Sequence, residues 1–270
     1  MSNSFLYQTT RMFGSSILKN RFNPKIINKG LIPSDGPLIL CGNHMSSLDP
    51  FILMSSTKRT IHFLLDNDSY DENSKLLLKM MGISSINDTN VDELMTKYLD
   101  EDGCICFFPE EKRNILTDEE LRYLYDLKQC NVPFDEFTRL IDSHTFLSQI
   151  KYLEKLCNEG VITLGTFKLG VLHAKSTLLE LVEDKVISKD DYDDSLILPF
   201  SAKAVEMAKK TGALVVPFAV NGDYAKLNDN LVIRFGEGFT VKQNDDIEEA
   251  NSFLREKVKK MVRENTRIKF

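Results

Sequence analysis

The sequence predicts an α/β fold in which a mixed, largely parallel sheet is flanked by helices. Three apolar runs carry this prediction, because each has the length of a buried strand and ends abruptly in polar residues or proline: 37–42, 104–108 and 212–220. Buried parallel strands present their ligand-binding groups at their carboxyl ends. The chain has 270 residues with 42% apolar content, enough for a sizeable core. We therefore expect one main domain with an appendage.

The first 30 residues predict an amphipathic helix at a membrane surface. They contain five basic residues and no acidic residue, and apolar side chains recur at roughly helical spacing from Phe5 to Phe22. No run approaches the roughly 18 apolar residues of a membrane span, and no signal-peptide pattern is present. The helix is expected to lie on an anionic bilayer. The alternative is a helix packed on its own domain.

The first apolar run leads into His44, and Asp49 follows five positions later. Histidine titrates near neutrality, and a carboxylate on its other ring nitrogen would fix the tautomer. On one straight helix, residues five apart point ~140° away from each other, so a turn or helix start must separate the pair. We interpret the pair as a general base with its orienting acid. A hydrogen-bonded structural histidine is the alternative.

Two further segments have the same form, a buried strand that ends in polar residues. The second apolar run ends at Pro109 and continues into Glu110 and Arg113, and the third contains Pro217 and ends at Gly222. Because carboxyl ends of parallel strands share one edge of a sheet, these segments are expected to form one site with His44.

Together, the three segments resemble the glycerophospholipid acyltransferase family over about residues 20–113 and 196–265. Its motifs N-H-x-x-x-x-D, F-P-E-G-T-R and V-P are matched, in order, by Asn43, His44 and Asp49, by Phe108, Pro109, Glu110 and Arg113, and by Val216 and Pro217. Glu111 and Lys112 replace the Gly and Thr of the second motif.

The resemblance implies transfer of a fatty acyl group from acyl-CoA or acyl-carrier protein to a lysophospholipid hydroxyl, with 1-acylglycerol-3-phosphate as the acceptor, in phospholipid synthesis. His44 takes the hydroxyl proton, Asp49 holds His44, and no covalent acyl-enzyme, cofactor or metal is expected. The remaining motif residues are assigned to substrate binding: Asn43, Pro109, Glu110, Arg113 and Pro217.

Two departures from the family leave the acceptor open. Acidic or amide side chains at Asp66, Asn67, Asp68 and Asp88 stand where relatives carry basic residues. Phosphate recognition relies on Arg and Lys donors, so these changes favour an alternative acceptor, an amine or an unphosphorylated lipid. A second alternative is a lipid-binding or scaffold protein without turnover. The presence of both His44 and Asp49 argues against it.

Composition narrows the other possibilities. A net charge of −6 without an aromatic, basic stripe argues against nucleic-acid binding. Five cysteines without zinc-ligand spacing predict packed thiols in a reducing compartment. The basic stretch 254–270 predicts an amphipathic surface helix. We expect a cytoplasmic protein, peripheral on the inner face of a membrane.

Residues 114–194 predict a helical insertion within the acyltransferase domain, which comprises 31–113 and 195–270. Three similar units, each a helix followed by a polar turn and a second short helix, are anchored by Leu124 to Phe137, Leu153 to Phe167 and Leu178 to Tyr192. A capping box is expected at the start of the first unit, from Thr117 to Glu120. His144 and His173 lack metal partners at ligand spacing. The insertion is expected to bind a protein partner.

Overall fold

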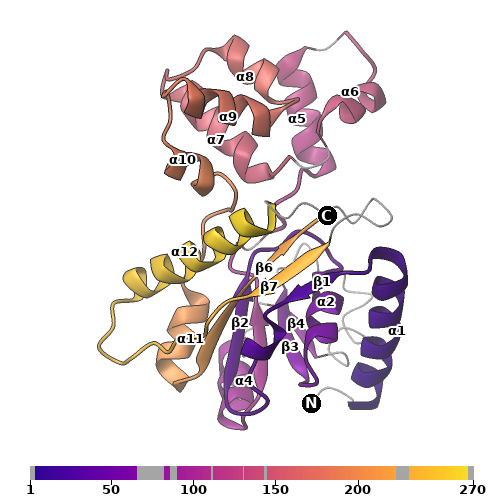
Figure 1. Ribbon diagram of the computed structural model, residues 1–270, viewed down its shortest axis with the longest axis vertical. Helices are drawn as coiled ribbons and strands as arrows, with labels where there is room; N and C mark the ends of the chain where they lie inside the picture. The colour runs from indigo at the N-terminus through magenta and orange to yellow at the C-terminus, as the bar shows by residue number, and fades with distance from the viewer. Residues whose placement is uncertain are drawn as a thin grey trace. The chain divides into compact units, whose positions relative to one another are not determined.

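The computed structural model divides into two compact units (Figure 1). One, the α/β unit, comprises Met1–Arg113 and Pro199–Phe270, and the other, the insertion unit, comprises Asn114–Leu198. The second unit thus extends four residues beyond the expected boundary at 194. The structure describes residues 4–65, 82–85, 90–110, 112–129, 131–142, 145–222 and 231–266.

The described part of the α/β unit holds a seven-stranded sheet in the order β1-β7-β6-β2-β5-β3-β4. Only the β6–β7 pair is antiparallel, so the predicted mixed, largely parallel sheet is confirmed. The three apolar runs of the sequence form the adjacent strands β6, β2 and β5. The strand bounds are β1 Lys25–Ile27, β2 Leu38–Gly42, β3 Ile61–Leu65, β4 Ile83–Ser85, β5 Cys104–Phe107, β6 Leu214–Asn221 and β7 Val232–Phe235.

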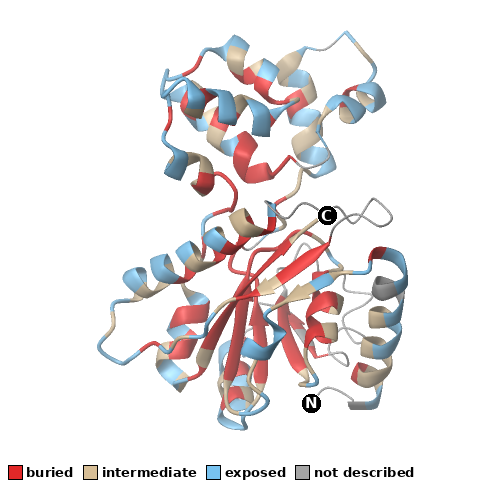
Figure 2. Ribbon diagram, viewed as in Figure 1, coloured by how far each residue is buried: buried red, intermediate tan, exposed pale blue. Residues whose placement is uncertain are grey.

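Helices cover both faces of this sheet (Figure 1). On β2, Leu38 and Leu40 pack in one core cluster with Ile52 of α2, whereas the intervening Ile39 points to the opposite face. That opposite face is covered by α4, α11 and α12. Burial follows this pattern and is deepest in the central strands (Figure 2). The helix bounds are α2 Asp49–Ser56, α4 Val91–Asp100, α11 Lys203–Thr211 and α12 Ile247–Thr266, with a 3-10 turn η1 at Lys29–Leu31.

The C-terminal helix α12 is amphipathic, as predicted. It buries a stripe of Leu254, Val258, Met261 and Val262. Near its end, the Asn265 amide donates to the Ala219 carbonyl of β6 (3.1 Å) and accepts from Arg234 Nε of β7 (3.0 Å). The helix end is therefore tied to the carboxyl-terminal part of β6.

The N-terminal helix α1 (Ser4–Phe22) packs on the α/β unit along one side and exposes apolar side chains along the other. Tyr7 is fully buried, and its hydroxyl accepts the Ile61 N–H at 2.8 Å. Phe5, Met12 and Phe13 are 77%, 68% and 68% exposed. No described helix is long and apolar enough to cross a membrane. The helix therefore packs on α2, reaches β3 through Tyr7, and exposes apolar side chains on another side.

The cysteines that the structure places in the sheet are packed thiols, as expected. Cys41, Cys104 and Cys106 are free and buried in β2 and β5. Burial raises the pKa of the Cys104 thiol to about 12, which keeps it protonated and unreactive at neutral pH.

The insertion unit has its own hydrophobic core and three consecutive helix pairs. Leu124 and Phe137, Leu153 and Phe167, and Leu178 belong to this core, so these predicted anchors are buried together; Tyr192 packs against it. The predicted capping box is present, because Thr117 caps α5 reciprocally with Glu120. The helices are α5 Asp118–Lys128, α6 Phe134–Leu140, α7 Leu147–Asn158, α8 Leu164–Gly170, α9 Ala174–Glu183 and α10 Lys189–Asp194.

The three pairs turn in the same way between their helices. A residue with positive φ follows the first helix of each pair: Gln129 (52°), Gly160 (72°) and Lys185 (59°). After α7 and α9, the next residue donates back to the third-last helical residue, Val161 N–H to Leu156 O and Val186 N–H to Leu181 O, both at 2.9 Å. The insertion unit is thus an irregular structural repeat.

The two ends of the insertion unit lie close together. The Asn114 side chain is fully buried and bonds both to Ser148, near the start of α7, and to the Leu196 carbonyl at 3.0 Å. Within the α/β unit, the Ser201 N–H donates to the Pro109 carbonyl at 2.9 Å. Each unit therefore has a hydrogen bond of its own next to the points where the chain passes from one unit to the other.

We expect the α/β unit to fold without the insertion unit. Replacing 114–198 with a Gly-Ser linker of about six residues should leave a cooperative thermal transition, because Pro109 and Ser201 already hold the cut ends together and changes in loop length cost only about 0.6 kcal/mol per doubling. Circular dichroism and thermal melting measure this. Acceptor choice or a partner interaction should change before the fold does.

Two results would contradict this expectation. An insoluble or molten variant would show that the insertion unit is needed for folding. A folded variant identical to the parent in acceptor profile, membrane binding and oligomeric state would show that the insertion unit is a neutral appendage.

Candidate active site

His44 and Asp49 form a buried hydrogen-bonded pair at the carboxyl end of β2. His44 Nδ1 lies 2.9 Å from Asp49 Oδ2, and the two residues are 5% and 0% exposed. The strand ends at Gly42, and α2 begins at Asp49. The turn that the spacing requires is therefore present, and the predicted base and acid are brought into contact.

Asp49 also organises the turn between the two residues. Its Oδ2 accepts the backbone N–H groups of Met45 (2.7 Å) and Ser46 (2.9 Å). The carboxylate lies in the first turn of α2, at the positive end of the helix dipole. An ionised Asp49 accepts only, so His44 Nδ1 carries the proton and Nε2 keeps its lone pair. Within the described part of the chain, Nε2 has no hydrogen-bond partner, so it is available to take a proton.

An aromatic side chain supports the imidazole from the neighbouring strand. The Phe108 ring stacks on His44 with centroids 4.2 Å apart and an interplanar angle of 28°, and its own edge meets Phe218 at 6.0 Å. From the sequence, Phe108 was assigned only to the F-P-E-G-T-R motif, and its contact with His44 was not predicted. The available signal was its position directly after β5, a strand adjacent to β2.

The main chain around His44 is fixed from both neighbouring strands. Glu110 Oε2 accepts the His44 N–H at 2.8 Å. On the other side, the Asn43 amide donates to the Val220 carbonyl (2.9 Å) and accepts the Val220 N–H (2.8 Å). The resemblance assigned Asn43 and Glu110 to substrate binding. In the structure, both side chains are buried and bind backbone.

Close packing of β2 on β6 leaves no room for a side chain at Gly42. An added Cβ there would overlap the carbonyl oxygen and the ring of Phe218. Pro217, the predicted wall residue, is paired with Cys41 in this part of the ladder and is buried. Pro109 is also buried and bonds Ser201 through its carbonyl. Pro217 therefore lies within β6, and Pro109 lies two residues beyond the end of β5.

Arg113 is the remaining predicted site residue. Its side chain is half-buried and makes no hydrogen bond or ion pair with the described residues. It follows Glu110 by three positions in the sequence. The acidic and amide residues at 66–68 and 88, Glu111 and His144 lie outside the described residues. His173 is exposed and pairs with Asp142 at 3.3 Å, away from any motif.

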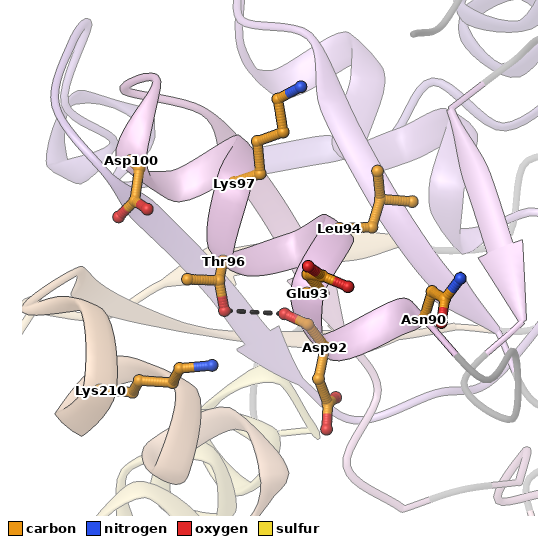
Figure 3. A pocket seen from close by; sticks show the side chains of 8 residues that line it. All are labelled: Asn90, Asp92, Glu93, Leu94, Thr96, Lys97, Asp100 and Lys210. Carbon is orange, nitrogen blue, oxygen red and sulfur yellow. Dashed lines mark hydrogen bonds between the residues drawn. The ribbon is translucent and has the colours of Figure 1, made fainter.

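A separate hollow on the α/β unit runs along α4. It is lined by Asn90, Asp92, Glu93, Leu94, Thr96, Lys97, Asp100 and Lys210 (Figure 3). The charged side chains are of both signs. The Thr96 hydroxyl donates a hydrogen bond to the Asp92 carbonyl at 2.7 Å. None of the motif residues lines it, so we assign it no part in the chemistry.

Two of three comparisons with known proteins found a match. The crystal structure of the 1-acyl-sn-glycerophosphate (LPA) acyltransferase PlsC from Thermotoga maritima has a similar fold, with a TM-score of 0.58 and 13% identity, over 99% of this chain and 83% of that chain. A search of curated proteins gave no match. The model of the family described as Acyltransferase matches residues 23–221. That match spans well over half of the chain, and the protein is therefore a member of the acyltransferase family and an enzyme of that class.

Proposed function

We propose that the enzyme transfers a fatty acyl group from an acyl thioester, acyl-CoA or acyl-carrier protein, to the free hydroxyl of a lysophospholipid. The observation that carries the proposal is the buried His44–Asp49 pair, in which Nδ1 is held by a carboxylate and Nε2 makes no hydrogen bond to the described residues. The proposed acceptor is 1-acylglycerol-3-phosphate.

The chemistry follows from the state of the imidazole. The acceptor hydroxyl oxygen attacks the thioester carbonyl carbon while His44 Nε2 takes its proton. The tetrahedral intermediate collapses, the C–S bond breaks, and the departing thiolate takes the proton back from the imidazolium. Asp49 stabilises the imidazolium in between. No acyl-enzyme is formed, so no nucleophilic side chain is needed.

The phosphorylated acceptor is supported by Arg113 and by the structural similarity to PlsC, which is a 1-acyl-sn-glycerophosphate (LPA) acyltransferase. A guanidinium without a partner among the described residues can bind a phosphate through two parallel hydrogen bonds. The acidic residues at Asp66 and Asp88 favour the second candidate, an unphosphorylated or amine acceptor. A lipid-binding scaffold without turnover is disfavoured by the intact His44–Asp49 pair.

We further propose that the enzyme docks on a membrane through α1. Phe5, Met12 and Phe13 are spaced by seven and eight residues and therefore share one side of the helix. They are exposed, while Tyr7 anchors the helix to the sheet. A lipid surface would cover these side chains, and Arg11 and Arg21 on the same helix suit anionic headgroups.

His44→Ala should lower acyl transfer by at least ~100-fold without unfolding the protein, because it removes the general base. Asp49→Asn should cost a comparable factor, since an amide would no longer hold Nδ1 as the donor. The measurement is transfer of a radiolabelled acyl group in variants that retain their circular dichroism and melting temperature. His173→Ala, an exposed histidine of the insertion unit, is the control. Activity within a few-fold of wild type in a folded His44→Ala protein would remove His44 from the mechanism.

Arg113→Ala should raise KM for 1-acylglycerol-3-phosphate by roughly tenfold or more, the effect of losing one charge-assisted contact, and leave monoacylglycerol turnover unchanged. A panel of phosphorylated, unphosphorylated and amine acceptors measures this. Arg139→Ala, on an exposed surface of α6, is the control. A wild type that prefers an unphosphorylated or amine acceptor, together with an indifferent Arg113 variant, would establish the second candidate.

Replacing Phe5, Met12 and Phe13 together by Ser should weaken sedimentation with anionic liposomes by at least tenfold, because burying one large apolar side chain is worth ~1.5–3 kcal/mol. The melting temperature should hardly change, since these side chains are exposed. Substitution is a cleaner test than deleting 1–22, because Tyr7 and Phe22 belong to the core. Leu169→Ser, at a 71% exposed position of the insertion unit, is the control. Undiminished liposome binding would show that α1 serves the fold alone.

A further inference from the structure

We infer that Glu110 is a positioning residue that holds the main chain of His44, and that it does not bind the acceptor. This inference rests on the proposed function for the role of His44 as general base. It reassigns a motif residue that the family resemblance places against the glycerol-phosphate end of the substrate.

The register of the sheet shows how Glu110 reaches His44. The last aligned pair between β2 and β5 is Cys41 with Phe107. His44 and Glu110 each lie three residues beyond that pair, and Glu110 Oε2 accepts the His44 N–H at 2.8 Å. A side-chain carboxylate thus continues the ladder at a point where backbone pairing has stopped.

On the β6 side of β2, a side chain again bonds the backbone of the neighbouring strand. The last aligned pair between β2 and β6 is Gly42 with Phe218, and immediately beyond it the Asn43 amide bonds both polar groups of the Val220 backbone. Consecutive residues at the end of β2 are therefore fixed from the two neighbouring strands. The backbone that carries the imidazole has no freedom to slide along either of them.

The Glu110 side chain is also buried in the α/β unit. Glu110 is only 5% exposed. Burial, and secondly the charge of Glu110, raise the pKa of the Cys41 thiol, the last residue of β2 that is aligned with β5. A buried carboxylate is costly unless it is hydrogen-bonded, and the His44 N–H supplies a charge-assisted bond.

The position of His44 controls the rate because proton transfer requires hydrogen-bond distance. A displacement of about 1 Å in a reacting group can cost ~100-fold in rate. Loss of the Glu110 bond is expected to act on kcat through this displacement. It leaves the acceptor's binding contacts in place.

The test compares Glu110→Ala with Glu110→Gln, whose amide oxygen still accepts the His44 N–H. Kinetics with 1-acylglycerol-3-phosphate give kcat and KM separately. Selective ¹⁵N-histidine labelling reports the backbone amides of the four histidines, and His44→Gln assigns the His44 resonance. Glu101→Ala, an exposed glutamate just before β5, is the matched control.

We expect Glu110→Ala to lower kcat by ~100-fold with KM for the acceptor within about twofold, and to speed His44 amide exchange by ~10-fold or more. Glu110→Gln should recover most of the lost kcat and amide protection. The Glu101 variant should match wild type in both measurements.

Three outcomes would overturn the inference. One is a raised acceptor KM with unchanged kcat and an unshifted His44 amide, which would make Glu110 an acceptor ligand. Another is a Gln variant as slow as the Ala variant while its His44 amide stays protected, which would mean that the negative charge itself is required. The third is an unprotected His44 amide in the wild type.

If Glu110→Ala fails to fold, the kinetics of the Gln variant and the exchange of the wild-type His44 amide still test the inference. The amide readout needs no turnover, so failure of the proposed acceptor would be seen separately.

Discussion

The site depends on one buried carboxylate, that of Asp49. It lies at the first position of α2, and a single oxygen receives His44 Nδ1–H and the main-chain N–H groups of Met45 and Ser46. An ionised group without solvent is tolerated only when it is bonded in this way. The same bonds hold the turn before α2 and select the tautomer of the His44 imidazole. The path of the turn and the orientation of the imidazole therefore depend on the same buried carboxylate.

The sheet adds a second constraint, the position of β2 between β5 and β6. Because β2 is paired on both sides, its carboxyl end is fixed by its neighbours, and Phe108 supports the imidazole from the β5 side. Gly42 permits the close approach of β6. Several residues that a motif would assign to substrate thus act on the protein itself. Among the described residues, His44 Nε2 and the Arg113 guanidinium are the motif groups that make no hydrogen bond, and they are the ones proposed to act on the substrate.

The sequence predicted the central part of the fold and the pair at its centre. Apolar runs identify β2, β5 and β6 because strands buried on both faces are continuously hydrophobic. The antiparallel β7 and the short edge strand β1 could not be predicted in the same way, since their pairing depends on contacts distant in sequence. The backbone bonds of Asn43 and Glu110 depend on strand register. Composition likewise left α1 open between a membrane and its own domain, and the fully buried Tyr7 shows that it packs on its own domain along one side.

The turns of the insertion unit show how that unit keeps its shape. Gly160 adopts positive φ without strain, but Gln129 and Lys185 hold the same left-handed conformation with a side chain, at a cost of ~1–2 kcal/mol. After Lys185, the Ser188 cap of α10 and the shared core hold that path in place of glycine. Several independent contacts encode one backbone course, so no single surface position is indispensable. Such a unit can change its outer residues extensively during evolution and still present them on the same scaffold.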